Sequence, residues 1–190
     1  MKKQGKLIII AGPSGVGKGT VRSEILKNKS LDFAFSISYT SRLPRKGETD
    51  GVDYFFVKEK EFLSLIKDNE FIEYNKYVGN YYGTSRTQIN NLRKKGKNII
   101  LEIDVNGTRN VMSQFDKSEI ISFFILPPSL KELEKRIRLR STENNLTIIN
   151  RLKRAKEELK LKKYFNYQII NDDPKRAAKE IINILKSEIK

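Results

Sequence analysis

The sequence predicts a three-layer α/β fold with a mostly parallel sheet, and two observations lead to this expectation. The apolar run from Leu7 to Ala11 leads straight into a glycine-rich loop and then into a helical pattern. Apolar runs typical of buried strands return at residues 98–104, 120–126 and 167–170, with helical patterns between them. Strands that alternate with helices build a parallel sheet covered by helices, and ligands bind at the carboxyl ends of its strands.

The glycine-rich loop has the spacing of a phosphate-binding loop. Residues 12–18 read GPSGVGK, which is G-x-x-x-x-G-K directly after a strand, and a helix is expected to start near Lys18 or Thr20. Such a loop aims backbone N–H groups inward, and its lysine reaches the outer phosphates of a nucleotide. The alternative, an ordinary exposed lysine at a ligand-free turn, would set positive charge against the helix dipole. We therefore expect a nucleoside triphosphate at Gly12, Pro13, Ser14, Gly15, Val16, Gly17, Lys18, Gly19 and Thr20.

Residues from about 37 to 83 are expected to form a small strand-rich insert after the first strand, loop and helix. A strand feeds a basic turn at residues 42–47, and Gly79-Asn80 has the composition of a hairpin turn. The elements expected up to the next core strand are strands at 33–39 and 52–57, a helix at 61–68, a hairpin at 71–82 and a helix at 85–95.

The parallel core is expected to resume at residue 98. Pro127-Pro128 stops the strand at 120–126, and Ser129 with Glu132 forms a capping box for the helix that follows. Asp173 and Pro174 are typical of the start of the last helix. The remaining expected elements are a polar break at 141–145, a basic helix at about 147–163 and a strand at 167–170.

Composition narrows the classes of function. The 190 residues suit one α/β core with added subdomains. The chain has no cysteine and no histidine, which excludes disulfides, thiolate zinc sites, cysteine nucleophiles and a histidine base. No apolar run is long enough to span a membrane, and the run after Met1-Lys2-Lys3 is too short for a secretory signal. We expect a cytoplasmic protein without a membrane partner.

The formal net charge of +15 suits a polyanionic partner, either nucleic acid or phosphorylated small molecules. The lysines are scattered, and no basic and aromatic array typical of RNA-binding modules is present, so a compositional bias explains most of them. We therefore expect no nucleic-acid partner. The arginines differ from the lysines because several of them occur in tight local sets.

Two of these arginines flank Pro44 in a stiff turn. Arg42 and Arg45 follow the segment from Ser38 to Thr40, whose hydroxyl groups can join two forked donors on a phosphate distinct from the one at the loop. Two solvated turn arginines are the alternative, and spacing alone does not decide. Glu73, in a predicted strand, can accept an imino and an amino hydrogen from guanine, although an exposed strand glutamate is the commoner case.

Further candidate residues lie in the second half of the chain. Glu102 and Asp104 face the same side of a core strand at its end, where a magnesium or substrate site would lie; a turn-forming role applies better to Asp104. Arg136, Arg140 and Arg151 lie on two predicted helices around the polar break, where a mobile segment can bring them over transferring phosphates. An ordinary solvated basic face is their alternative.

Motifs follow one another through nearly the whole chain. They are GPSGVGK at 12–18, SISYTSRLPRKGE at 36–48, GVDY at 51–54, NEFIE at 69–73, GNYYGT at 79–84, LEIDVNG at 101–107, PPS at 127–129, the segment 140–143 and NDD at 171–173. In this order and combination the sequence resembles the guanylate kinase family. The arginine turn and the Asn-Tyr-Tyr-Gly motif are much more specific than the loop alone.

The resemblance implies a P-loop kinase that transfers the γ-phosphoryl group of ATP to GMP or dGMP with Mg²⁺, as a monomer or homo-oligomer. It implies a core at 1–36, 97–128 and 164–190, a GMP-binding insert at 37–96, and a lid with flanking helices at 129–163. The GMP phosphate would be held by Ser38, Arg42, Arg45, Tyr54 and Tyr82, and guanine would be read by Glu73 and Thr84 with help from Asp104, while Glu102 is a further GMP-site candidate. The catalytic set would be Lys18, Arg42, Arg136, Arg140 and Arg151, with Asn171 near the adenine of ATP.

Three positions depart from the commonest family pattern. Gly19 replaces a serine after the loop lysine, Glu102 stands where aspartate is usual, and Ser141 replaces a glycine in the lid. Because residue 19 has no hydroxyl group, Mg²⁺ is expected to be held mainly by phosphates and water, with Thr20 or Glu102 as candidate ligands. None of the three changes is expected to inactivate the protein.

Two other functions compete with this reading. A guanylate-kinase-like module that binds phosphopeptides without catalysis usually lacks a working phosphate loop, whereas this chain keeps Gly12, Gly17 and Lys18. A nucleoside monophosphate kinase for another base is the second competitor, and Glu73 and Thr84 favour guanine over it.

Overall fold

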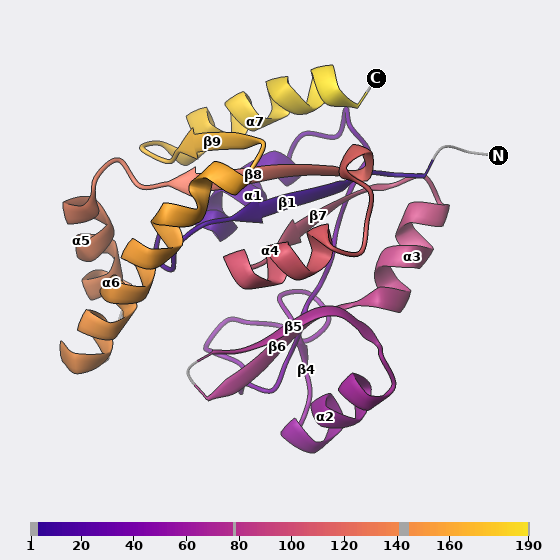
Figure 1. The fold of residues 1–190 in the computed structure, drawn as a ribbon, viewed down its shortest axis with the longest axis horizontal. Helices are drawn as coiled ribbons and strands as arrows, with labels where there is room; N and C mark the ends of the chain where they lie inside the picture. The colour runs from indigo at the N-terminus through magenta and orange to yellow at the C-terminus, as the bar shows by residue number, and fades with distance from the viewer. Residues whose placement is uncertain (1–3, 78, 141–144, 190) are drawn as a thin grey trace. The chain divides into compact units, whose positions relative to one another are not determined.

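A computed structural model describes residues 4–77, 79–140 and 145–189 of the chain (Figure 1). Strands of the described residues form two sheets, a five-stranded sheet in the order β2-β7-β1-β8-β9 and a four-stranded sheet in the order β4-β3-β6-β5. The bounds of the strands are β1 Leu7–Ala11, β2 Phe33–Phe35, β3 Tyr39–Thr40, β4 Phe55–Phe56, β5 Phe71–Tyr77, β6 Asn80–Ser85, β7 Asn98–Glu102, β8 Ile120–Leu126 and β9 Tyr167–Ile170.

Helices separate most of these strands, as expected for the α/β class. They are α1 Lys18–Leu26, α2 Glu59–Lys67, α3 Arg86–Lys94, α4 Val105–Met112, α5 Leu130–Arg140, α6 Asn145–Lys160 and α7 Pro174–Glu188, with short 3-10 turns at Lys117–Glu119 and Leu161–Tyr164. No helix in the described part of the chain is long and apolar enough to cross a membrane.

The chain divides into two compact units. The first comprises Met1–Leu7, Ala34–Leu101 and Asn106–Ile120, and the second comprises Ile8–Phe33, Glu102–Val105 and Ile121–Lys190. The division into core, insert and lid that the family resemblance implies is a different one, and it stays a prediction.

The four-stranded sheet of the first unit is built on an antiparallel hairpin. In this hairpin Glu73 of β5 lies opposite Thr84 of β6, and the register shifts between Phe71 and Glu73. The ring of Phe62 in α2 stacks on that of Phe71, with 4.5 Å between the ring centroids. These stacked rings form an aromatic core of the small sheet.

The strands at the centre of the five-stranded sheet are thoroughly buried. All five residues of β1 are buried, as are the first six of β8, and β8 pairs with β9 in parallel. Helix α7 packs on α1 and on β9, and it buries Ile181 and Leu185. The glycine-rich loop joins β1 to α1, two elements of this packed core.

Two expected elements differ in the structure, each for a local reason. The strand expected at 33–39 splits into β2 and β3 because Oε1 of Gln88 accepts the N–H of Ile37 and the hydroxyl of Ser36, replacing a strand partner. The strand expected at 52–57 shrinks to β4 because Thr49 and Asp53 hold a turn. After Asp104, for which a turn-forming role was the alternative, the chain continues into helix α4, because its buried side chains, among them Val105 and Val111, override the low helix propensity of Asn-Gly.

Candidate functional site

The loop predicted to bind phosphate joins β1 to α1 in the second unit. Gly17, directly before α1, has a φ of 93°, in the left-handed region that favours glycine. A Cβ atom on Gly17 would stand only 2.5 Å from Nδ2 of Asn171. Glycine at this position therefore lets the chain enter α1 while Asn171 packs against the loop, and it leaves the first N–H groups of the helix directed toward the loop.

Lys18, the first residue of α1, folds back over the loop. Its Nζ donates to the carbonyl oxygens of Gly12 at 2.6 Å and Pro13 at 3.2 Å. The ammonium group is half-buried, so its positive charge is concentrated at the loop. Such a charge can exchange carbonyl partners for the more strongly attracting oxygens of a phosphate.

Asn171 and Arg136 connect two other elements to the same loop. Nδ2 of Asn171, which follows β9, donates to the carbonyl oxygen of Val16 at 2.7 Å, and Nη1 of Arg136 in α5 donates to this oxygen at 3.3 Å and to that of Asn171 at 3.1 Å. Asn171 is 2% exposed, and its Oδ1 accepts no hydrogen bond from the described residues. A buried acceptor left unpaired costs about 1–3 kcal/mol, so Oδ1 is suited to a ligand donor.

A further arginine reaches the loop from α6. Nη2 of Arg151 donates to the hydroxyl oxygen of Ser14 at 2.8 Å. Together with Lys18 and Arg136, Arg151 gives the loop three cationic side chains from three different helices. The side chain of Arg140 and the whole of Ser141 lie outside the described residues.

Glu102, at the end of β7, faces the start of α1. A Cβ atom on Gly19 would stand 3.7 Å from Oε2 of Glu102, and Nη1 of Arg22 lies 3.2 Å from the same oxygen. This Oε2 atom is buried and accepts no hydrogen bond within the described part of the chain. A Cβ atom at residue 19 would make only an ordinary contact with this oxygen, so the Glu102 carboxylate lies directly beside the start of α1. Thr20, the other candidate ligand for a cation, is exposed.

A three-membered ion network follows β7. Nη2 of Arg154 lies 3.2 Å from Oδ2 of Asp104, and its Nε donates to Oε1 of Glu158 at 3.0 Å. Burial raises the pKa of Glu158, although Arg154 and Lys18 act in the opposite direction. Neither Arg154 nor Glu158 was expected from the sequence; their spacing from Arg151 on one helix face was the available signal.

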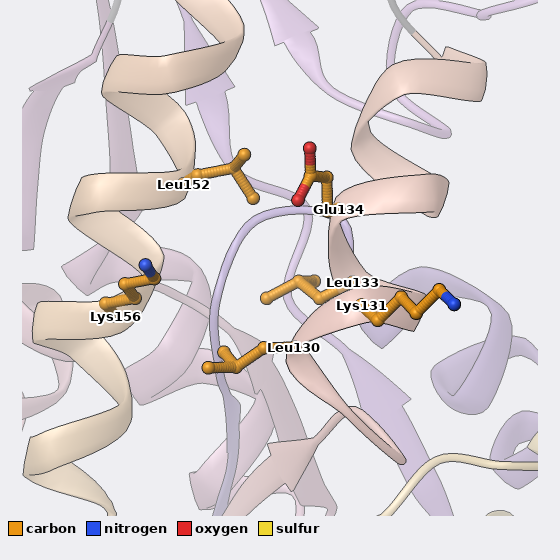
Figure 2. Close-up of a pocket in the computed structure, with 6 residues that line it drawn as sticks. All are labelled: Leu130, Lys131, Leu133, Glu134, Leu152 and Lys156. Carbon is orange, nitrogen blue, oxygen red and sulfur yellow. The ribbon is translucent and has the colours of Figure 1, made fainter.

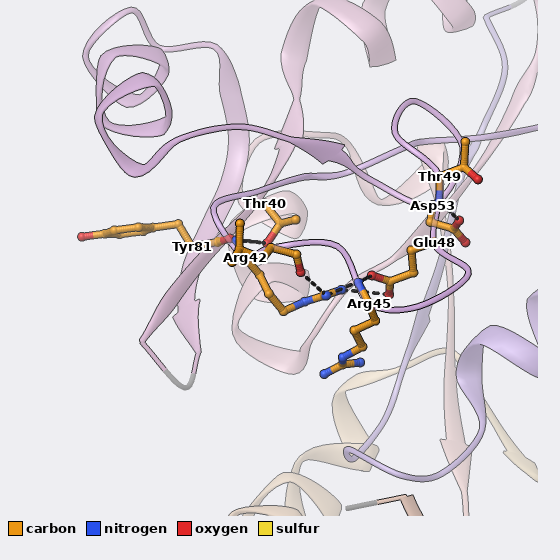
Figure 3. Close-up of polar contacts among 8 residues, drawn as sticks. Thr40, Arg42, Arg45, Glu48, Thr49, Asp53 and Tyr81 are labelled. Carbon is orange, nitrogen blue, oxygen red and sulfur yellow. Dashed lines mark hydrogen bonds and ion pairs between the residues drawn. The ribbon is translucent and has the colours of Figure 1, made fainter. Parts of the chain in front are cut away.

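In the first unit, the basic turn is built around an ion pair between Arg42 and Glu48 (Figure 3). Nη1 and Nη2 of Arg42 each donate to one carboxylate oxygen of Glu48 at 2.9 Å, and the backbone N–H of Arg45 donates to the same carboxylate at 2.7 Å. The two side chains of the pair are only 13% and 19% exposed. The hydrogen bond from Arg42 holds the pKa of Glu48 below its usual value.

The two arginines of the turn have different environments. Arg42 is enclosed, so it is not a solvated turn residue, whereas Arg45 is exposed and its guanidinium group points away from the ion pair (Figure 3). Ser38 lies just before β3, and its carbonyl oxygen accepts the N–H of Phe55 at 2.9 Å, which places it beside β4. The structure thus brings Arg42 and Glu48 together but leaves the side chain of Arg45 outside the pair.

Aromatic rings enclose the guanidinium group of Arg42. Its Cζ lies 5.5 Å from the ring centroid of Tyr54 and 5.7 Å from that of Phe56, and the centroids of Tyr54 and Tyr82 are 6.0 Å apart. Burial opposes the charge of Arg42, but hydrogen bonds to Glu48 and Tyr82 outweigh it and raise the pKa of Arg42. The Nε atom is buried and donates to no acceptor among the described residues. This combination of positive charge and a vacant donor is suited to an anion.

Glu73 is a buried carboxylate rather than an exposed strand residue. It is 7% exposed, and its Oε1 accepts a hydrogen bond of 2.6 Å from the hydroxyl group of Thr84, which is 1% exposed. Ile72 is buried as well, because the register shift between Phe71 and Glu73 interrupts the strand alternation. The two residues predicted to read guanine are therefore in direct contact, whereas Asp104, the third, belongs to the second unit.

A groove of about 280 Å³ lies between α5 and α6, and the side chains of Leu133 and Leu152 point toward one another across it (Figure 2). None of the predicted site residues lines it. Within the described ranges, no group of three or more acidic, histidine or cysteine side chains gathers as a metal cage would.

Known proteins that are similar to this chain are guanylate kinases. Residues 4–188 match the family model described as "Guanylate kinase". A guanylate kinase of Mesoplasma florum is 47% identical over 97% of this chain, which spans 62% of that protein, and one of Malacoplasma penetrans is 45% identical over 98% of this chain and 95% of its own length.

A solved structure gives the same result for the fold. The crystal structure of guanylate kinase from Anaplasma phagocytophilum superposes with a TM-score of 0.81 at 33% identity, covering 99% of this chain and 88% of that one. The predicted α/β fold with a mostly parallel central sheet is thereby confirmed. On these grounds, the chain belongs to the guanylate kinase family.

Proposed function

We propose that this chain transfers the γ-phosphoryl group of ATP to the phosphate of GMP or dGMP, giving ADP and GDP or dGDP. The observation that carries this proposal is the buried pair of Glu73 and Thr84, in the same small sheet as the enclosed Arg42. Guanine offers an N1–H and a 2-amino group on one edge, and a carboxylate can accept from both. Adenine, cytosine and uracil do not present this pair of donors.

The acceptor phosphate belongs at Arg42. The Nε–H group of Arg42 is buried without an acceptor, and Tyr54 and Tyr82 lie beside it. A phosphate on this side would receive charge-assisted hydrogen bonds from the guanidinium group and from tyrosine hydroxyls. Ser38 and the exposed side chain of Arg45 would complete the set once the phosphate is present.

The donor phosphates belong at the loop between β1 and α1. Lys18, Arg136 and Arg151 already contact loop atoms, so they can neutralise the charge of a triphosphate with little rearrangement. In the reaction an oxygen of the GMP phosphate forms a bond to the γ-phosphorus, and the bond from this phosphorus to the bridging oxygen of ADP breaks. Such a transfer depends on positioning and charge neutralisation and needs no strong base, which suits a chain without histidine or cysteine.

Asn171 is proposed to contact the adenine of ATP. Its Nδ2 is occupied by the carbonyl oxygen of Val16, which leaves the buried Oδ1 as an acceptor. The 6-amino group of adenine is a donor of the matching kind, whereas the 6-oxo group of guanine is not.

Mg²⁺ fits the proposed ATP site at the loop between β1 and α1. Oε2 of Glu102 is a buried carboxylate oxygen that accepts no hydrogen bond from the described residues, and it lies beside Gly19 at the start of α1. We propose that Mg²⁺ is held mainly by ATP phosphates and water, with Glu102 favoured over the exposed Thr20 as the protein ligand. When bound, the ion neutralises phosphate charge and aligns the triphosphate.

The proposed reaction also defines the partners and the location of the protein. The substrates are the small molecules ATP and GMP or dGMP, and neither nucleic acid nor a membrane has a role in the reaction. A cytoplasmic location fits a reaction between two cytoplasmic nucleotides. A phosphopeptide-binding module is the weaker alternative, because Lys18 and two arginines are gathered at a glycine loop that such a module does not use.

A panel of acceptors tests the proposal. With ATP and Mg²⁺, a coupled assay of ADP formation should give turnover with GMP and dGMP and little with AMP, CMP or UMP. Equal turnover with AMP would contradict the guanine assignment. Binding of GMP with no turnover of any acceptor would instead support the phosphopeptide-binding alternative.

A further inference from the structure

The basic turn of the first unit contains a carboxylate to which neither the sequence analysis nor the proposed function gives a role. Glu48 accepts three hydrogen bonds, two from the guanidinium group of Arg42 and one from the backbone N–H of Arg45. The surrounding turn is otherwise open, because Leu43 is 83% exposed and Gly47 has no atom near the position of a Cβ. Glu48 is thus the group that joins the two ends of an exposed turn (Figure 3).

We infer that Glu48 is a positioning residue for the acceptor phosphate, acting through Arg42. This inference rests on the proposed function, since it assumes that the GMP phosphate binds at Arg42. A carboxylate paired with a phosphate-binding arginine can act in two opposite ways. It can hold the guanidinium group in the binding orientation, or it can compete with the phosphate and weaken its binding.

The atoms used by the pair distinguish these two possibilities. Glu48 occupies the end of the guanidinium group, with one bond to Nη1 and one to Nη2, and the other hydrogen of Nη1 goes to the carbonyl oxygen of Leu43 at 2.7 Å. A guanidinium group has five N–H donors in a fixed fork. The donors that neither Glu48 nor Leu43 engages, Nε–H and the second hydrogen of Nη2, lie on the other edge. On this edge Nε is buried without an acceptor among the described residues, and the hydrogen bond to Tyr82 leaves the Nε–H donor unused. Glu48 and a phosphate can therefore bind Arg42 at the same time.

The surroundings of the turn support a positioning role. The backbone N–H of Arg42 donates to the hydroxyl oxygen of Thr40 at 3.2 Å, and this hydroxyl group donates to the carbonyl oxygen of Tyr81 at 2.9 Å. The start of the turn is therefore attached to the strands, while its far end is attached through Glu48. Without the carboxylate, the long Arg42 side chain would regain rotamer freedom that phosphate binding must then remove.

The test compares ligands with and without a phosphate in the Glu48→Gln variant. We expect the KM for GMP to rise at least about tenfold, because charge-assisted bonds that orient Arg42 are lost. The KM for ATP should stay within about twofold of that of the unaltered chain. The inhibition constant of guanosine, as a competitor of GMP, should not change, because guanosine carries the base without the phosphate.

Two further sets of variants define the mechanism. In the Arg42→Ala background, adding Glu48→Gln should cause no further rise in the KM for GMP, because Glu48 acts only through Arg42. Asp53→Asn is the matched control: Asp53 accepts the N–H of Thr49 in the neighbouring turn at 2.9 Å, and it should leave the KM for GMP within about twofold. Glu48→Asp, which keeps the charge on a shorter side chain, provides a second test should the glutamine variant fold poorly, and it should raise the KM for GMP as well.

Each possible outcome has one meaning. A lower KM for GMP in Glu48→Gln would show that Glu48 competes with the phosphate, and an equal loss of guanosine binding would show that it only maintains the fold; either result would overturn the inference. An effect of Arg42→Ala without any effect of the Glu48 variants would overturn the inference and leave the proposed function intact. No effect of Arg42→Ala would instead remove the proposed phosphate site itself.

Discussion

The two proposed phosphate sites, one in each unit, hold their charged groups by different means. At the loop of the second unit, the backbone provides the shape, with Gly17 at a positive φ, and Lys18, Arg136 and Arg151 donate to backbone or hydroxyl oxygens of the loop. At the turn of the first unit, side chains provide the shape, with Arg42 held by a carboxylate and enclosed by rings.

This difference follows from the ligands that the loop and the basic turn are proposed to bind. A triphosphate presents many oxygens along its length, which a loop of backbone N–H groups can follow. A single acceptor phosphate presents a compact group, for which one oriented guanidinium fork is sufficient. We therefore expect changes of the backbone to affect the loop more strongly, and changes of side-chain charge to separate the two substrates.

The largest expected effect belongs to Lys18→Ala. Loss of the ammonium group should lower kcat by about a thousandfold, because it removes a charge proposed to stabilise the transferring phosphoryl group. Binding of GMP, measured by equilibrium titration, should remain within a few-fold. If GMP binding were lost together with turnover, the separation of the two phosphate sites would be wrong.

Two glycine substitutions compare the backbone of the phosphate-binding loop with that of the basic turn directly. Gly17→Ala forces a left-handed residue and a contact of 2.5 Å with Asn171, so it should cost about 3 kcal/mol of unfolding free energy. Gly47→Ala in the basic turn has a similar φ of 88° but open space around it, and it should cost about 1 kcal/mol. Urea denaturation of both variants measures the difference, and equal losses would argue against a tightly packed loop.

Substitution of Glu73 tests the base-reading half of the acceptor site. Glu73→Gln keeps the size of the side chain but replaces one acceptor oxygen with a donor, so the KM for GMP should rise about 10- to 50-fold. The KM for ATP is the internal control and should change little. A larger effect on ATP than on GMP would refute the role of Glu73 in reading guanine.

The smallest expected effect is a pH dependence of stability at the ion pair. Arg42 lowers the pKa of Glu48 in the folded state, so the pair stabilises the fold above the ordinary glutamate pKa of about 4.3 and loses this contribution as pH falls through the lowered value. At pH 7 the Tm of Glu48→Gln should lie about 2 °C below that of the unaltered chain. Thermal unfolding should show this gap closing in acid, and a gap independent of pH would exclude the ion pair as its source.

Sequence reasoning located most elements of the fold because apolar spacing reports burial directly. Strands β1 and β8 begin and end close to where the sequence predicts, and helix α7 begins there too, since each buries a continuous or regularly spaced apolar face. The prediction of one strand at 33–39 was wrong because a side chain replaced a backbone partner, as Gln88 does at the break between β2 and β3. No local pattern reveals that a glutamine fifty residues away will accept those hydrogen bonds.

The sequence identified the residues of the candidate sites only in part, for a similar reason. The loop motif identified Lys18 because its backbone geometry is encoded in consecutive residues, whereas Glu48 appeared only as part of a motif and had no role of its own. Arg154 and Glu158 were missed because a basic helix face has the same sequence pattern whether it is solvated or packed beside Asp104. The residue roles taken from the family resemblance remain predictions until substitutions test them.

By itself, the sequence determined the α/β class, the phosphate loop and the family, because these depend on residue order and short-range spacing. Only the tertiary structure decided that Glu73 is buried against Thr84, that Arg42 is held while Arg45 is exposed, and that Glu102 lies beside Gly19. These facts depend on a register shift, a turn and the meeting of distant elements. Burial and pairing of a charge are set by neighbours that the local sequence does not specify.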